Sequence, residues 1–215
     1  MNKDNSQDTE KSNSQDEDKI RLNPEITMMV FKFNFVNMEE IDLEKVAKWS
    51  GGHYDKDNFA GLIFYMGDDE EINYENPKKG NKKTLLLYES GKGIITGCKD
   101  EEKAQELLNT MKQYLRNVEE VDFKITNMTA NVKIDYMINL NEFSKYSSET
   151  YRPGTFPCAG FRDEENNTYA RVSGKGNISI VGAKSKEDVY QISEKIENIL
   201  NKHSELVREK DLENN

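Results

Sequence analysis

The sequence predicts an α+β fold built from two copies of one unit, and two observations carry this prediction. The first is a glycine-containing turn that leads through a β-type run into an acidic helix start. It occurs at Ser90-Gly91-Lys92-Gly93 and again at Ser173-Gly174-Lys175-Gly176. The second is a Tyr–Phe pair five residues apart, which occurs at Tyr54 and Phe59 and again at Tyr151 and Phe156. Recurrence in the same order indicates an internal duplication.

The first copy begins with a strand from Ile26, because apolar residues alternate there with more polar ones. A short helix over 39–49 follows, and Gly51-Gly52 stops it. Strands are predicted at 60–66, 85–88 and 93–96. A long helix then starts near Asp100, because apolar residues recur along one helical face. These residues are Ala104, Leu107, Leu108, Met111, Leu115 and Val118.

The second copy repeats this order. It has a long strand at 121–135, a short helix marked by Leu140, Phe143 and Tyr146, and a closing helix from Lys186. The closing helix is expected to bury Val189, Ile192, Ile196, Ile199 and Leu200. The Tyr–Phe pairs lie 97 positions apart and the Ser-Gly-Lys turns lie 83 apart, so we assign the difference of 14 residues to a charged insertion at 68–83.

The chain is thus predicted to have four parts: a disordered acidic tail (1–22), a first repeat (23–119), a second repeat (120–204) and a polar C-terminal tail (205–215). The N-terminal tail has almost no apolar residues to offset the entropy lost on ordering. Two such repeats can join into one curved sheet with both long helices on one face. The other face would carry exposed apolar and aromatic side chains, which usually mark a binding surface.

Composition excludes several classes of protein. The 215 residues carry a formal net charge of −10, which is unusual for a nucleic-acid-binding protein because Lys and Arg drive binding to phosphate. There is no apolar run of the ~18 residues that span a bilayer, so we expect a soluble intracellular protein. Cys98 and Cys158 are too few for a disulfide framework and are predicted to be buried thiols. We find no convergent set of catalytic or metal-binding side chains, and expect neither an enzyme nor a cofactor.

In their order and duplication these features resemble the TATA-box-binding protein family. The segments that carry the resemblance are Asp122-Phe123-Lys124-Ile125-Thr126-Asn127-Met128, Tyr54-x4-Phe59-Ala60-Gly61-Leu62-Ile63, Tyr151-x4-Phe156-Pro157, Ser90-Gly91-Lys92 through Thr96-Gly97-Cys98-Lys99, and Gly182-Ala183-Lys184. The resemblance covers about Pro24 to His203. It implies a saddle of ten antiparallel strands with helices on the convex face and a concave face that sits in the DNA minor groove.

The family uses two pairs of aromatic side chains as wedges between base steps. The resemblance places Phe59 and Tyr88 in the first pair and Phe156 in the second. The partner of Phe156 is Ser173 if the repeats are aligned without gaps, or Arg171 if the Ser-Gly-Lys turns are matched. Neither is aromatic, so the first repeat is expected to kink DNA more than the second.

The resemblance also implies contacts in the groove and with phosphates. The family places one Asn per repeat at the centre of the groove. Asn127 fits the second repeat, and Met28, or Val30 after a two-residue shift, stands in the first. A groove-facing Thr is kept as Thr96 and becomes Val181. The candidates for phosphate contacts are Lys92, Lys99, Arg162, Lys175 and Lys184, and Tyr65 replaces the Arg that would match Arg162.

The function that the resemblance implies is a non-enzymatic general transcription factor. Such a factor binds and bends A·T-rich promoter DNA and nucleates initiation with a transcription factor IIB-like protein and the RNA polymerase machinery. The alternative is an interaction module of that machinery with weak or no DNA bending, which the acidic charge and the incomplete second wedge favour. We expect no membrane or small-molecule partner, and a location in the nucleus, or in a cytoplasmic viral factory if the chain is viral.

Overall fold

The computed structural model describes residues 19–36, 38, 40–66, 83–116, 118, 120–147 and 151–210. The first repeat contains β1 (Glu25–Val36), α1 (Leu43–Ser50), β2 (His53–Asp55), β3 (Phe59–Met66), β4 (Lys83–Tyr88), β5 (Lys92–Cys98) and α2 (Glu101–Lys112). The second contains β6 (Glu120–Lys133), β7 (Tyr136–Ile138), α3 (Leu140–Phe143), β8 (Cys158–Asp163), β9 (Thr168–Ser173), β10 (Asn177–Ala183) and α4 (Lys186–Lys202). Short 3-10 helices at Ser144–Tyr146 and Ser204–Leu206 and the strand β11 (Val207–Glu209) complete the described chain.

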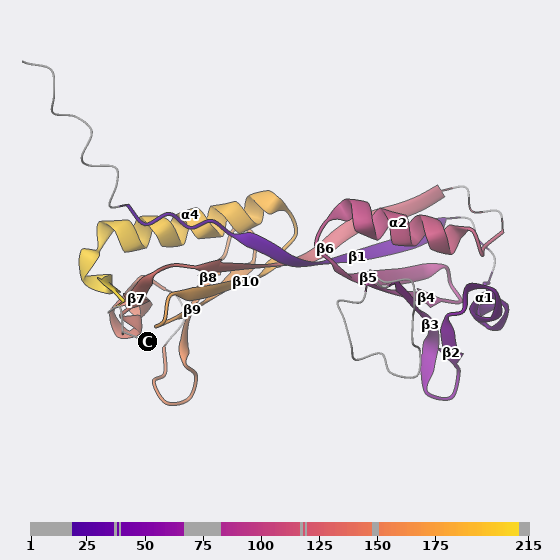
Figure 1. Cartoon of the computed structure of the whole chain (residues 1–215), viewed down its shortest axis with the longest axis horizontal. Coiled ribbons are helices and arrows are strands. Elements are labelled where there is room, and N and C mark those ends of the chain that lie inside the picture. The colour runs from indigo at the N-terminus through magenta and orange to yellow at the C-terminus, as the bar shows by residue number, and fades with distance from the viewer. Residues whose placement is uncertain are drawn as a thin grey trace, which may run out of the picture.

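One antiparallel sheet runs through both repeats in the order β2-β3-β4-β5-β1-β6-β10-β9-β8. The two longest strands, β1 and β6, pair along their whole length at the centre, so each repeat forms one half of the sheet. Figure 1 shows α2 lying over one half and α4 over the other, on the same side of the sheet. This arrangement confirms the predicted duplicated α+β fold.

The predicted ten-stranded sheet has nine strands in the described part of the chain. β2 pairs with β3 at one end, but the corresponding segment of the second repeat, 151–157, forms no strand before β8. Pro153 and Pro157 in this segment lack the backbone N–H that a strand ladder uses, and Gly154 has a φ of 85°. The two ends of the sheet therefore differ.

The core lies between the sheet and the two long helices. α2 starts after Asp100, whose side chain accepts a hydrogen bond from the Lys103 backbone N–H at 2.8 Å. α4 starts with a capping box formed by Ser185 and Asp188. The predicted apolar faces of both helices are buried. The buried residues are Ala104, Leu107, Leu108 and Met111 in α2, and Val189, Ile192, Ile196 and Leu200 in α4, while Ile199 is half-buried.

Several element boundaries differ from the prediction. α2 ends at Lys112, so Leu115 and Val118 lie beyond the helix, where they pack against the core from an irregular segment. The helix predicted at 39–49 starts only at Leu43, because Asp42 caps it by accepting a hydrogen bond from the Lys45 backbone N–H at 3.0 Å. The strand predicted at 121–135 is β6 and ends at Lys133.

The register of the strands shows how the repeats correspond. The turn before β5 has Gly91 at φ 78°, and its N–H donates to the Tyr88 carbonyl at 2.9 Å. The turn before β10 has Gly176 at φ 77°, with its N–H donating to the Ser173 carbonyl at 3.1 Å. Gly91 and Gly176 are 85 positions apart. The prediction that the Ser-Gly-Lys turns are equivalent at 83 positions is therefore wrong by two residues.

The predicted N-terminal tail boundary at residue 22 is also wrong. Ile20 and Leu22 are buried at 6% exposure each, against α4. The Ile20 backbone N–H donates to Asn201 Oδ1 at 2.9 Å, and Asn201 Nδ2 donates back to the Ile20 carbonyl at 2.8 Å. The Leu22 N–H donates to Glu197 Oε2 at 2.7 Å. Residues 19–24 thus form part of the fold that covers α4.

The predicted polar C-terminal tail begins with structured residues as well. Leu206 is 1% exposed, and β11 pairs with β7 through Val207 and Ile138. The predicted insertion at 68–83 lies outside the described residues, except Lys83, which opens β4. No described helix combines the length and hydropathy needed to span a membrane.

Candidate nucleic-acid interface

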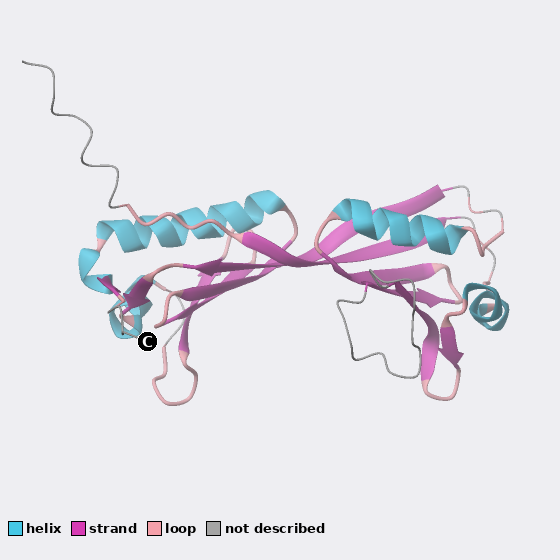
Figure 2. Ribbon diagram, viewed as in Figure 1, coloured by secondary structure: helices cyan, strands magenta, loops and turns pink. Residues whose placement is uncertain are grey.

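The sheet face opposite α2 and α4 is the candidate functional surface, and we call it the open face. Figure 2 shows both helices on one side of the sheet, with loops at each end of the sheet extending toward the other side. Directly paired residues of neighbouring antiparallel strands point to the same side. The strand register therefore identifies which side chains share the open face.

An exposed aromatic pair, Phe59 and Tyr88, stands on the open face of the first repeat. Their ring centroids are 6.0 Å apart, with the planes tilted by 56°, and Phe59 is 36% exposed. Gly61, the strand partner of Tyr88, lies beneath them. A Cβ atom there would be 2.8 Å from Cε1 of Phe59 and 3.0 Å from Cε1 of Tyr88. Glycine at this position therefore lets both rings lie over β3.

The second repeat has a different pair at the corresponding place. Cys158 pairs with Ser173, just as Gly61 pairs with Tyr88, so Ser173 occupies the place of the second wedge residue. Phe156 is 45% exposed, and the guanidinium carbon of Arg171 lies 5.7 Å from its ring centroid. The partner of Phe156 is thus Ser173 by register and Arg171 by contact, and the contact is a cation–π interaction.

At the centre of the open face, equivalent positions of the two repeats differ in polarity. Asn127 Oδ1 accepts a hydrogen bond from the Gly182 backbone N–H at 2.9 Å, which leaves the amide Nδ2 as a donor. Relative to β5 and β10, the residue of β1 that matches Asn127 is Met28, because Met29 pairs with Cys98 as Met128 pairs with Ala183. Met28 Sδ lies 3.7 Å from Thr96 Oγ1. Val181 stands where the first repeat has Thr96.

The predicted phosphate contacts are spread over both repeats. Lys92, Lys175 and Lys184 are exposed. Lys99 is also exposed, and its Nζ lies 3.8 Å from Glu25 Oε1. Arg162 Nη1 donates to Asn167 Oδ1 at 3.1 Å, and its guanidinium carbon lies 5.3 Å from the Tyr169 ring centroid.

Two further lysines were missed by sequence reasoning. Lys32 and Lys124 are cross-strand partners on the open face, and both are exposed. With Tyr88 and Lys92 they help to line a hollow of about 610 Å³ in the first repeat. Their alternation with buried Phe31 and Phe33 along β1, and with Phe123 and Ile125 along β6, was the available signal.

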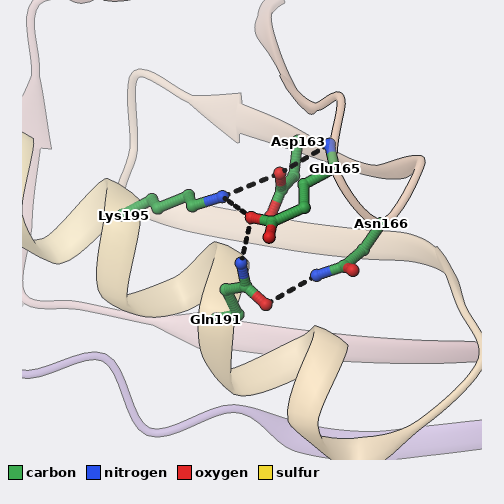
Figure 3. A network of polar contacts seen from close by, with 5 residues as sticks. All are labelled: Asp163, Glu165, Asn166, Gln191 and Lys195. Carbon is green, nitrogen blue, oxygen red and sulfur yellow. Dashed lines mark hydrogen bonds and ion pairs between the residues drawn. The ribbon is translucent and has the colours of Figure 1, made fainter.

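A polar network fixes the turn that carries Asn167. Figure 3 shows Lys195 of α4 between Asp163 and Glu165, with Nζ 2.8 Å from Asp163 Oδ1 and 3.4 Å from Glu165 Oε2. Gln191 Nε2 donates to Glu165 Oε2 at 2.8 Å, and Asn166 Nδ2 donates to Gln191 Oε1 at 2.6 Å. The network ties the β8–β9 turn to α4.

The thiols differ from one another. Cys98 is fully buried, as predicted, and burial raises its pKa to about 11. Cys158 is only half-buried and lies on the open face opposite Ser173, so the prediction of a buried thiol is wrong for it. Among the residues that the structure describes, no three His, Cys, Asp or Glu side chains are grouped to hold a metal ion.

Known proteins share this architecture. The TATA-box-binding protein of Methanococcus aeolicus is 32% identical over 166 residues, which are 74% of this chain and 85% of that protein. The TATA-box-binding protein of Candida albicans is 26% identical over 177 residues, 77% of this chain and 68% of that protein. The solved structure of Methanococcus jannaschii TBP superposes with a TM-score of 0.68 at 26% identity, covering 83% of this chain and 98% of that one.

The family model described as "Transcription factor TFIID (or TATA-binding protein, TBP)" matches the chain twice, at 23–118 and 122–203. The two matches fall on the two structural repeats and together cover most of the chain. The pseudo-twofold sheet, the helices on one face and both sequence matches lead to one assignment: the chain belongs to the TATA-binding protein family of transcription factors.

Proposed function

We propose that the open face binds the minor groove of A·T-rich promoter DNA and bends it to nucleate transcription initiation. The observation that carries the proposal is the exposed Phe59–Tyr88 pair, with ring centroids 6.0 Å apart on the open face. Apolar wedges of this kind unstack base steps at a cost of about a few kcal/mol, which the wider contact with bent DNA offsets; this family is itself a well-known example of such wedges.

Local charge supports the proposal although the net charge is −10. Lys32, Lys124 and Arg171 are exposed on the open face. Asp122 and Glu25 also lie on this face by register, and further acidic residues lie at the first turns of α2 and α4. Binding to phosphates depends on the cations that face the groove, so a net negative chain can still bind DNA through the lysines and arginines of its open face.

We infer that the helix side receives the protein partners, including a transcription factor IIB-like factor and the polymerase machinery. This side stays accessible when DNA occupies the open face. Trp49 at the end of α1 and Tyr190 on α4 are 51% and 57% exposed. Large exposed aromatic side chains are enriched at protein interfaces.

The decisive experiment measures bending of an end-labelled A·T-rich duplex by fluorescence energy transfer at low salt. Phe59→Ala combined with Tyr88→Ala is expected to abolish measurable bending, because the first repeat then has no wedge. Phe156→Ala is expected only to reduce bending. Its neighbours Ser173 and Arg171 are not aromatic, so the second repeat lacks a complete wedge pair to stack on the bases even in wild type. Trp49→Ala, which changes an exposed aromatic residue of α1, is the matched control and should bend DNA as wild type does.

A gain-of-function variant tests the register. Ser173→Phe should tighten binding, because Ser173 occupies the place that Tyr88 holds in the first repeat. Arg171→Phe should not tighten it. A wild type that does not bend the duplex, or a double Ala variant that bends it equally well, would contradict the proposal and leave the interaction module as the function.

A further inference from the structure

The two repeats present different chemistry in the middle row of the open face. In the first repeat, the strand register places Ile63 beside Leu86, Leu86 beside Ile94 and Ile94 beside Lys32. Ile63, Leu86 and Ile94 are half-buried aliphatic side chains, and Lys32 at the end of the row is exposed. The corresponding row of the second repeat is assigned by the same register. It consists of Gly160, Arg171, Ser179 and Asn131.

The equivalence of these rows follows from pairs already fixed. Gly61 pairs with Tyr88 and Cys158 pairs with Ser173, and each row lies two residues further along the same strands. Leu86 therefore matches Arg171, and Ile94 matches Ser179. Arg171 is exposed, and its guanidinium is held over the Phe156 ring at 5.7 Å.

The minor groove distinguishes base pairs mainly by one group. A·T pairs offer only acceptors there, whereas G·C adds the guanine N2 amino donor. Neither an aliphatic side chain nor a lysine ammonium can accept a hydrogen bond, so the first-repeat row leaves that donor buried and unpaired, which costs on the order of a tenfold loss of affinity. A hydroxyl or an amide oxygen can accept it, and a guanidinium donates to the purine N3 and pyrimidine O2 acceptors that every pair offers.

We propose that the two repeats read different base pairs: the first requires A·T, through Ile63, Leu86 and Ile94, and the second tolerates G·C, through Arg171, Ser179 and Asn131. This inference rests on the proposed binding of DNA by the open face. Its consequence is polarity. The protein binds an asymmetric site in one orientation, with the second repeat on the half that contains G·C pairs.

A palindromic A·T duplex tests the proposal without any need to observe orientation directly. Three versions are titrated: unchanged, with two G·C pairs in one half, and with two G·C pairs in both halves. The wild type is expected to lose less than ~3-fold in affinity with one substituted half, because it can rotate to place the second repeat there. It should lose ~10-fold or more when both halves are substituted.

Inosine·cytosine pairs are the chemical control, because they lack the N2 amino group and present the same minor groove as A·T. Replacing both G·C sets by inosine·cytosine should restore affinity to within ~3-fold of the unchanged duplex. A loss that persists with inosine would assign the effect to DNA deformability. That result would overturn the proposal.

Exchanging the rows supplies the protein side of the test. Arg171→Leu with Ser179→Ile and Asn131→Lys should make one substituted half cost ~10-fold, because the second row then matches the first at these positions and neither can accept a hydrogen bond from guanine. Leu86→Arg with Ile94→Ser should let the protein tolerate two substituted halves. Thermal midpoints show whether each variant folds. Leu86 and Ile94 are half-buried, so the second variant can fail to fold. In that case the first variant alone suffices for the test.

The outcomes separate the two proposals. If the wild type binds the unchanged duplex but loses ~10-fold with a single substituted half, both repeats require A·T and only the difference between them fails. If it tolerates two substituted halves, neither repeat selects A·T and the inference also fails. If it does not bind the unchanged duplex, the proposed function fails, and the inference with it.

Discussion

Lys195 Nζ lies 2.8 Å from Oδ1 of Asp163, and it is a cation that reaches this carboxylate from α4. The Asp163 side chain is only 2% exposed, whereas that of Lys195 is 39% exposed. Asp163 Oδ2 and the neighbouring Thr168 Oγ1 are buried and have no hydrogen-bond partner within the part of the chain that the structure describes. Removing one partner of such a pair leaves the other charge buried and uncompensated.

Lys195→Met is therefore expected to lower the free energy of unfolding by about 2 kcal/mol. Fully buried pairs lose about 3–5 kcal/mol when one partner is removed, and the partial exposure of Lys195 reduces this. Urea unfolding at pH 7 measures the change. Lys202→Met, which replaces an exposed lysine of the same helix, is the control. A combined Lys195→Met and Asp163→Asn variant should be more stable than Lys195→Met alone, and equal stability would contradict the role of the pair.

The duplication could be predicted from sequence because both repeats keep apolar alternation and helix starts in the same order. The equivalence of the turns could not. The letters Ser-Gly-Lys recur 83 positions apart, but the chain turns at the glycines with positive φ, Gly91 and Gly176, which are 85 apart. Backbone conformation and hydrogen bonds decide which residues of the two turns are equivalent, and neither can be inferred from matching residue letters alone.

The ends of the fold were missed for a related reason. Ile20 and Leu22 stand among polar residues, so no local pattern predicts their burial. Their burial depends on α4, which lies about 175 residues further along the chain and offers Glu197 and Asn201 as hydrogen-bond partners. Likewise Arg171 could be named from the sequence, but its contact with Phe156 required the structure.

Removal of residues 1–24 tests the contribution of this N-terminal segment. The truncated protein is expected to be less stable than wild type by about 2–3 kcal/mol, because burying one Leu or Ile contributes about 1.5–3 kcal/mol before the cost of ordering the chain. Removal of residues 1–18 is the matched control and should leave the thermal midpoint within ~2 °C, a range that corresponds to about 0.5–1 kcal/mol. Equal effects of the two truncations would contradict a stabilising role for Ile20 and Leu22.

Cys98 predicts a loss of stability at alkaline pH. Burial raises its pKa from 9.0 to about 11, so between these values the folded protein keeps a proton that the unfolded chain releases. Stability from this thiol is fully present below pH 9 and declines as pH rises toward 11, by up to ~2–3 kcal/mol. Unfolding measured at pH 8, 9, 10 and 11 follows the decline.

Cys98→Ala is the matched variant for that experiment, since the second repeat has Ala183 at the corresponding position opposite Met128. Tyrosines and lysines titrate in the same range in both proteins, so the difference between wild type and Cys98→Ala isolates the thiol. The variant should start with lower stability at pH 8 and lose less of it by pH 11. Parallel curves would show that Cys98 does not titrate as a buried thiol.

The Gly61→Ala variant tests whether Gly61 sets the spacing of the aromatic wedge or the stability of the sheet. A Cβ atom at Gly61 would lie 2.8 Å from Cε1 of Phe59 and 3.0 Å from Cε1 of Tyr88, and 3.2 Å from the Leu87 carbonyl oxygen. The two rings are side-chain ends at the open face, so they can move apart at low cost to stability. They would then leave the arrangement in which their centroids are 6.0 Å apart. We expect the thermal midpoint to change by less than ~4 °C, the shift that about 1 kcal/mol produces in a chain of this size.

The same variant should reduce DNA bending and weaken binding, because separated rings no longer enter one base step as a unit. Energy-transfer bending and gel-shift titration on the same duplex measure both effects. Cys158→Ala is the control, since Cys158 holds the place of Gly61 in the second repeat and Ser173, not an aromatic residue, lies opposite it. Wild-type bending by Gly61→Ala would mean that the spacing of Phe59 and Tyr88 does not set the kink. A large fall in stability would mean that the glycine serves the sheet, because the Leu87 carbonyl and not the rings would then be the group displaced.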